Sequence, residues 1–120
     1  MIKVDYEIYH NDYRRSDKVI TFGSLDELKD WLFGQMKRPY NDSYAMYFPN
    51  PNRADAEPSS IEIHPDFGEP TILIHQIENE NGIIFSDGRH TSGQKHWNNQ
   101  IKEWLVLCNN FKKAPQFKFA

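Results

Sequence analysis

The feature that most constrains the fold is the shortness of the connections between strand-like segments. Apolar and polar residues alternate from Ile2 to Tyr9, the pattern of a half-buried strand. Further strand-like segments follow at 18–22, 43–48, 60–64, 71–78 and 82–86. Parallel neighbours need a crossover of about a dozen residues or more, and few of these connections are that long. The sequence therefore predicts a mainly antiparallel sheet.

Two segments show helical spacing of apolar residues. The first follows a capping box, Ser24 to Glu27, and ends before Pro39. The second is predicted to run from about Ser92 to Phe111, with Thr91 or Ser92 as its cap and a stripe of Trp97, Ile101, Trp104, Leu105, Cys108 and Phe111. Residues 116–120, QFKFA, add a predicted terminal strand.

These elements predict one α+β domain spanning residues 1–120, with two helices on a mainly antiparallel sheet of five to seven strands. The expected order is β-β-α-β-β-β-β-α-β. No apolar run approaches the roughly 20 residues that cross a membrane, and the N-terminus lacks the apolar region of a signal peptide, so we expect a cytoplasmic protein that does not bind membranes. Cys108 is the only cysteine, which excludes an internal disulfide and a cysteine metal cage.

Charge is distributed unevenly along the chain. Residues 54–88 contain eight acidic side chains and no Lys or Arg, whereas residues 89–120 contain six basic side chains and one acid. One interpretation is that the two regions pack together and their charges partly cancel. The other is an acidic face that meets a basic protein partner, for which the candidate residues are Asp55, Glu57, Glu62, Asp66 and Glu69.

The stretch GRHTSGQKH, from Gly88 to His96, resembles a phosphate-binding loop, G-x-x-x-x-G-K-[ST]. Gln94 stands where that motif has its lysine, and Lys95 stands where it has the hydroxyl that binds magnesium. The sequence therefore argues against nucleotide hydrolysis. It leaves two alternatives, a turn that starts a helix, or an anion site formed by Arg89, His90, Ser92 and Lys95.

Other candidate chemistry lacks the spacing that would make it specific. Ser86, Asp87, His90, Ser92 and His96 crowd one turn, but no hydrolase signature is present. The candidates for a weak metal site are His64, His75, His90 and His96. They have no fixed carboxylate or cysteine spacing, so we expect no metal and no cofactor.

The C-terminal segment GIIFSDGRHTSGQKHWNNQIKEWL…APQFKF resembles the ends of small, mostly uncharacterised α+β proteins from conjugative and phage-like elements of Gram-positive bacteria. The resemblance covers about the last 40 residues. The order of elements is similar to that of immunity proteins of polymorphic toxin systems. Short acidic inhibitors, including anti-CRISPR proteins, come from the same genomic settings. The resemblance implies a stoichiometric binding protein and assigns no site residue.

We therefore expect a non-enzymatic protein that binds another macromolecule, in the first place a protein, as an inhibitor or accessory factor of a mobile element. The alternative is a protein that binds nucleic acid or phosphate through its basic C-terminal region. For that alternative, Arg14 and Arg15, at the tip of the first predicted hairpin, are further candidate contacts.

Overall fold

The computed structural model describes residues 1–36, 45–66 and 68–111. It has the predicted α+β class, with two helices and an antiparallel sheet of seven strands within the described residues. The elements are β1 (Ile2–Tyr9), β2 (Arg15–Phe22), α1 (Leu25–Gly34), β3 (Met46–Tyr47), β4 (Ile61–Ile63), β5 (Thr71–Asn79), β6 (Gly82–Asp87), β7 (Lys95–Trp97) and α2 (Asn99–Phe111).

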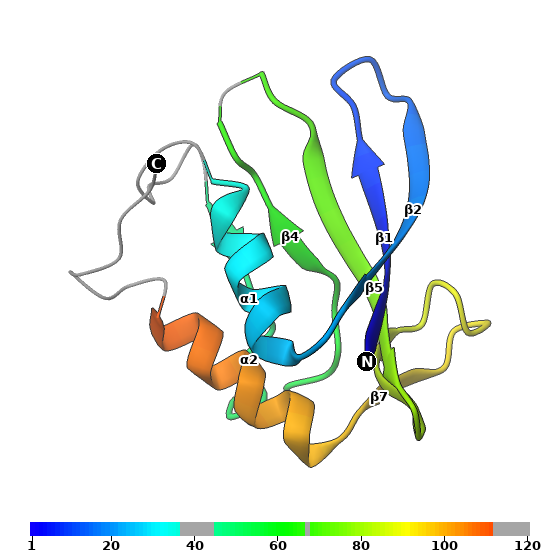
Figure 1. The fold of residues 1–120 in the computed structure, drawn as a ribbon, viewed down its shortest axis with the longest axis vertical. Helices are drawn as coiled ribbons and strands as arrows, with labels where there is room; N and C mark the ends of the chain where they lie inside the picture. The colour runs from blue at the N-terminus through cyan, green and yellow to red at the C-terminus, as the bar shows by residue number, and fades with distance from the viewer. Residues whose placement is uncertain (37–44, 67, 112–120) are drawn as a thin grey trace.

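Strand β5 is the centre of the sheet (Figure 1). Along one edge it pairs with β1, which in turn pairs with β2. Along its other edge it pairs first with β4, up to Ile74, and then with β6, from Gln76 onwards. Strand β3 continues the sheet beyond β4, and β7 continues it beyond β6.

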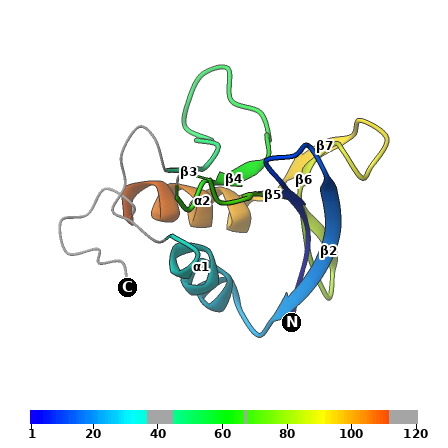
Figure 2. The same cartoon turned by 90° about the horizontal axis from the view of Figure 1, so that it is seen from above.

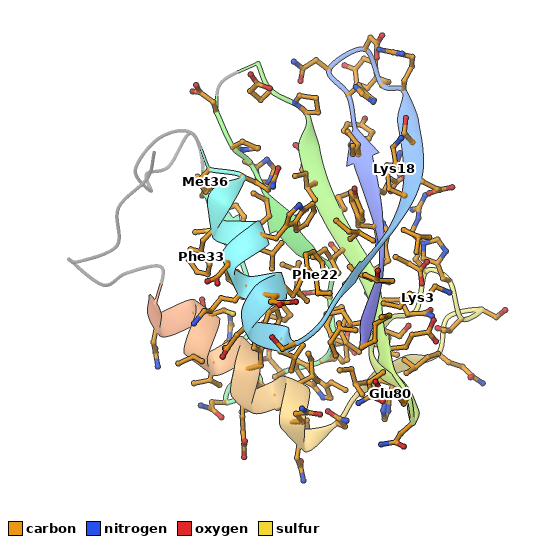
Figure 3. The ribbon with its side chains drawn as sticks, viewed as in Figure 1. Lys3, Lys18, Phe22, Phe33, Met36 and Glu80 are labelled. Carbon is orange, nitrogen blue, oxygen red and sulfur yellow. The ribbon has the colours of Figure 1, made fainter. Side chains whose placement is uncertain are left out.

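The core lies between the sheet and the two helices. Strand residues such as Val4, Ile74 and Phe85 are fully buried against Leu28 of α1 and Leu105 of α2. Helix α1 lies in front of the sheet and α2 runs across its lower end (Figure 1). Phe22 of β2 lies between the sheet and α1, where its ring packs against Trp31 (Figure 3). Two loops, 48–60 and 88–94, project on the side of the sheet opposite α1 (Figure 2).

The predicted cap of α1 is confirmed. The backbone N–H of Glu27 donates to Ser24 Oγ at 3.2 Å, which satisfies one of the amides left free at a helix start. The Glu27 carboxylate accepts a hydrogen bond from the N–H of Gly23, one residue earlier than in the usual capping box.

The predicted start of the second helix is wrong. Residues 95–97 form β7, which pairs with the end of β6, and α2 begins only at Asn99. The cap is Asn98, whose side-chain oxygen accepts from the N–H of Ile101 at 2.9 Å. The reason is that β6 is an exposed edge without β7, and pairing there satisfies backbone groups that a longer helix would leave bare. Trp97 still packs against the core, but from a strand.

Three smaller expectations can also be compared with the structure. Strand β2 begins at Arg15, three residues before its predicted start. Strand β3 is shorter than the predicted 43–48, part of which lies outside the described residues, as does the predicted terminal strand 116–120. Neither described helix has the length and apolar character needed to cross a membrane.

Candidate functional site

The most unusual feature of the sheet is a histidine at its centre. The register between β1 and β5 passes from Asp5 opposite Gln76 to Tyr6 opposite Ile74, so His75 is the extra residue of a β-bulge. On the other edge of β5 the same residue lies where pairing passes from β4 to β6. A bulge redirects side chains, and here it places a buried imidazole between two carboxylates.

Both ring nitrogens of His75 contact carboxylates. Nδ1 lies 2.6 Å from Asp87 Oδ2 and Nε2 lies 3.1 Å from Glu7 Oε1. Only 4% of the His75 side chain and 2% of the Glu7 side chain are exposed. Because an ionised carboxylate can only accept, both nitrogens donate, which is the state of the charged imidazolium. We call these three residues the Glu7–His75–Asp87 cluster.

The surroundings shift two pKa values in opposite directions. Burial by itself lowers the pKa of His75, but the hydrogen bonds and charges of Asp87 and Glu7 together outweigh it, and the pKa is raised above its ordinary value. Burial raises the pKa of Glu7, but the hydrogen bond from His75 and the charges of Arg89, Arg15 and His75 together lower it. Both shifts favour the charged forms, the imidazolium of His75 and the carboxylate of Glu7.

Two arginines cover the Glu7 carboxylate. Nη1 of Arg15, from β2, lies 3.3 and 3.4 Å from its two oxygens. Nη2 of Arg89, from the loop after β6, lies 3.4 Å from Oε2. The backbone N–H of Arg89 also donates to Asp87 Oδ1 at 2.9 Å. Four strands and the 88–94 loop are thus joined by one set of buried and half-buried charges.

Aromatic rings extend this cluster to the surface. The ring of His90 packs against His75, with 5.4 Å between centroids. The Arg15 guanidinium lies over the Tyr9 ring at 4.7 Å, and Tyr13 meets Tyr9 edge to face. We call Tyr9, Tyr13, Arg15, Arg89 and His90 the Tyr–Arg surface.

Tyr13 is the most exposed large hydrophobic side chain among the described residues. It is 81% exposed and has a backbone φ of 66°, in the left-handed region that glycine or asparagine usually occupies. Two backbone hydrogen bonds close the hairpin around it, from Tyr13 N–H to the His10 carbonyl and from His10 N–H to the Arg14 carbonyl, at 3.0 and 2.9 Å. The tight turn therefore holds Tyr13 in a backbone conformation that is unfavourable for a residue with a large side chain, while its ring is exposed.

The 88–94 loop is a compact hairpin connection rather than a phosphate-binding loop. Gly88 and Gly93 have φ values of 93° and 87°, and the Gly93 N–H donates to the Gly88 carbonyl at 2.8 Å. A Cβ on Gly88 would lie 3.1 Å from the carbonyl carbon of Gly93. Gly88 therefore allows a close backbone crossing, and both glycines supply the positive φ values of a turn. This turn leads into β7 and not, as the sequence predicted, into a helix.

The structure divides the four residues of the predicted anion site. Arg89 and His90 lie together at the Glu7–His75–Asp87 cluster. Lys95 instead pairs with Glu57 at 2.7 Å and lines a separate cavity of about 500 Å³ with Ser86 and Thr91 among others. Ser92 is exposed in the loop, at a φ of 56°. The cation beside Arg89 is Arg15 and not Lys95, which the local sequence motif had indicated.

The five candidate acidic residues lie on β4 and the segments before and after it. Asp55 and Glu57 precede the strand, Glu62 is on it, and Asp66 and Glu69 follow it. Glu57 faces Lys95, and Asp55 lies 3.8 Å from Arg53. The pairs Lys3–Glu78 and Met1 amino group–Glu80 neutralise further acids of segment 54–88. The acidic segment is thus partly cancelled within the chain.

The remaining candidates have other neighbours. His64 contacts the Thr71 hydroxyl at 3.2 Å and packs edge to face with Tyr47. Within residues 1–36, 45–66 and 68–111, no group of three or more His, Cys, Asp or Glu side chains is arranged to hold a metal ion. Burial raises the pKa of Cys108 to about 12, so its thiol is protonated and is a poor nucleophile.

Sequence reasoning missed Glu7 as part of the site, and it named Arg15 only as a further candidate contact for nucleic acid or phosphate. Glu7 belongs to the polar side of an alternating strand, and nothing local distinguishes it from Lys3 or Asp5. The sequence did contain one signal for the cluster, an isolated histidine inside the apolar strand pattern TILIHQIE. A histidine that is buried in such a strand needs polar partners.

Comparison of the chain with protein-family models, with curated protein sequences and with solved structures found no match.

Proposed function

We propose that this chain is a non-catalytic binding protein and that the Tyr–Arg surface is its contact with a protein partner. The observation that carries the proposal is Tyr13, an aromatic side chain 81% exposed and held at a φ of 66°. Stability alone favours Gly or Asn at such a position. An exposed ring on a backbone that is kept in a disfavoured conformation supports a role in binding another molecule, because it does not help the chain to fold.

The composition of the surface supports a protein partner. Tyrosine and arginine are the residue types that most often dominate binding energy at protein interfaces. These side chains are also held in place before binding, because Arg15 lies on Tyr9 and Arg89 is tied to Glu7 and Asp87. Groups that are already ordered lose less conformational entropy when a partner arrives.

The cluster beneath the surface supports binding rather than catalysis. A general base must reach its substrate with a free nitrogen, whereas both nitrogens of His75 are occupied by carboxylates. The buried groups therefore act as a rigid base for the exposed ones. We place the contact here rather than on the acidic residues near β4 because basic groups of the same chain already face part of that region.

The proposal is tested by replacing the exposed ring. Tyr13→Gly removes the ring and relieves the backbone, so the free energy of unfolding should change by no more than about 1 kcal/mol. Partner binding should weaken by about 2 kcal/mol or more, roughly thirtyfold. The measurement is affinity purification from a host cell that carries related mobile elements, followed by calorimetry with the purified partner.

The control is Leu107→Ala, which removes a 49% exposed apolar side chain from α2. Equal capture by the wild type and Tyr13→Gly would contradict the proposal, as would a loss of capture by Leu107→Ala alone. The identity of a captured partner would also decide between an inhibitor, an immunity protein and a conjugation factor.

A second candidate function is nucleic-acid binding, which is favoured by the approach of Arg15 and Arg89 beside two tyrosine rings. Stacked rings with nearby cations are the usual way to bind single strands. Titration with single- and double-stranded DNA and RNA at rising salt tests it. Binding through phosphates must weaken steeply as salt rises, and no binding at low salt would remove this candidate.

A further inference from the structure

We propose that Arg15 and Arg89 form a binding site for a single phosphate group, carried on a phosphorylated side chain of the partner protein. This inference rests on the proposed function, because it names the chemistry that the Tyr–Arg surface recognises. The site lies directly over the buried carboxylate of Glu7.

The first support is a set of unused hydrogen-bond donors. Nη1 of Arg15 and Nη2 of Arg89 each lie 3.4 Å from the same oxygen of Glu7, so the two guanidinium groups are neighbours. In the part of the chain that the structure describes, Nε and Nη2 of Arg15 and Nε and Nη1 of Arg89 have no protein acceptor. The side chains are 44% and 47% exposed, so a ligand can reach them.

The second support is the local charge. Arg15, Arg89 and the imidazolium of His75 carry three positive charges, and Glu7 and Asp87 carry two negative ones. Within this set of contacting groups one positive charge is left over, and it is shared by two guanidinium groups that repel each other. Asp17 lies opposite Glu7 in the β1–β2 register, but it is exposed and makes no ion pair with either arginine among the described residues. An anion placed between the two guanidinium groups on the solvent side would relieve that repulsion.

The arrangement suits a phosphate group better than a carboxylate. A carboxylate has two oxygens and is matched by the fork of one guanidinium, whereas a phosphate monoester has three and carries a charge of about −1.5 to −2. Here two guanidinium groups come from different elements, and the exposed His90 packs its ring against His75, which contacts the same carboxylate. Arginine clusters are a recurring means of recognising phosphorylated side chains.

The surroundings favour one phosphate over a nucleic-acid strand. A strand presents a phosphate at every nucleotide and is held by a row of cations. Near this site the other cations alternate with acids: Arg14 is paired with Asp12 at 2.7 Å, and Asp17 precedes Lys18 on β2. Among the residues that the structure describes, only the place above Glu7 combines two adjacent guanidinium groups with donors left over.

The experiment uses the full chain and three probes: a short Gly–Ser peptide with one phosphoserine, the same peptide without phosphate, and an oligothymidine. Binding is followed by NMR through the arginine side-chain Nε–H signals. We expect the phosphopeptide to shift the signals of Arg15 and Arg89, and the unphosphorylated peptide to leave them unchanged. Arg89→Gln should weaken binding roughly tenfold or more, because it removes a charged hydrogen-bond donor.

Two further variants separate the site from general charge. Arg15→Lys keeps the charge but loses the planar fork, and it should also weaken binding roughly tenfold. Lys18→Gln removes a positive charge from the same strand, outside the contacts to Glu7, and should weaken binding less than about twofold. Urea unfolding of each variant shows that the fold is kept, and Arg15→Lys serves if Arg89→Gln unfolds.

The proposal is overturned if the two peptides bind equally, if Lys18→Gln weakens binding as much as Arg89→Gln, or if oligothymidine binds more tightly than the phosphopeptide. That last result would favour the nucleic-acid alternative. Because these titrations contain no natural partner, they are independent of the Tyr13→Gly test. If Tyr13→Gly captured the partner as well as the wild type does, the proposed function would be contradicted. That result would not decide whether the arginines bind phosphate.

Discussion

At the scale of single residues, Glu7 shows how much one buried carboxylate can organise. Its oxygens accept from His75, Arg15 and Arg89, which come from β5, β2 and the 88–94 loop. Removing one partner of a buried charge pair leaves the others without compensation, and this is far more costly than losing a surface pair. Glu7 is therefore the side chain on which the Tyr–Arg surface depends most.

Glu7→Gln should lower the free energy of unfolding by roughly 3 kcal/mol, because it leaves three cations facing a neutral amide. The measurement is urea unfolding at neutral pH. The matched control is Glu78→Gln, the same change in the surface pair between Lys3 and Glu78, which should cost less than about 1 kcal/mol. Similar losses in both variants would show that the buried cluster contributes no more than a surface ion pair.

The two glycines of the 88–94 loop offer a second prediction at this scale. Both have φ values near 90°, but only at Gly88 would a Cβ press against backbone, at 3.1 Å from Gly93. Gly93→Ala should therefore cost about 1–2 kcal/mol, the usual penalty of the left-handed region. Gly88→Ala should cost clearly more. Thermal unfolding of both variants tests the order, and a larger loss for Gly93→Ala would contradict the described loop.

At the scale of elements, the sequence predicts types better than boundaries. Helix α1 was predictable because its cap and its apolar stripe are local. Strand β7 was not, because Trp97 has the spacing of a helical stripe, and only the unpaired edge of β6 gives residues 95–97 a reason to extend. The cluster was not predictable either, since the bulge at His75 arises from pairing between strands about 70 residues apart. Long-range pairing leaves no local trace.

The position of the α2 cap gives a prediction at this scale. Asn98→Ala should lower the free energy of unfolding by about 1 kcal/mol, because the amide of Ile101 loses its side-chain acceptor. Ser92→Ala should change it by less than about 0.5 kcal/mol, since Ser92 is exposed in the loop and caps no helix. The reverse order in urea unfolding would mean that the helix begins near Ser92 in solution, as the sequence pattern indicates.

At the scale of the whole molecule, the cluster connects both halves of the sheet. The β1–β2 hairpin supplies Glu7 and Arg15, and the later strands and loop supply His75, Asp87 and Arg89. The uneven charge of the sequence is resolved in the same way, because acids of segment 54–88 find cations elsewhere in the chain. Protonation of the cluster should therefore affect the global stability of the fold and not only one loop.

The dependence of stability on pH follows from the two shifted pKa values. The pKa of His75 is raised in the folded state, so its contribution is complete below the ordinary pKa of 6.5 and is lost as the pH rises through the folded value. The pKa of Glu7 is lowered, so its contribution is complete above the ordinary value of 4.5 and is lost as the pH falls through the folded value. From these two groups, stability should be greatest between about pH 4.5 and 6.5.

Above this range the neutral imidazole can donate to only one of Glu7 and Asp87, and the other carboxylate loses its hydrogen bond. Urea unfolding measured from about pH 5 to about pH 9 should therefore show a falling free energy of unfolding on the alkaline side. His75→Gln should be less stable at pH 6 and should lose most of that slope, because Gln carries no titrating proton. Arg15, Arg89 and His90 also face the cluster, so the control must be a histidine outside it. His64, which contacts Thr71, is such a residue, and His64→Gln should keep the slope. An unchanged slope in His75→Gln would assign the alkaline loss to another group and would show that the imidazolium does not hold the two halves of the sheet together.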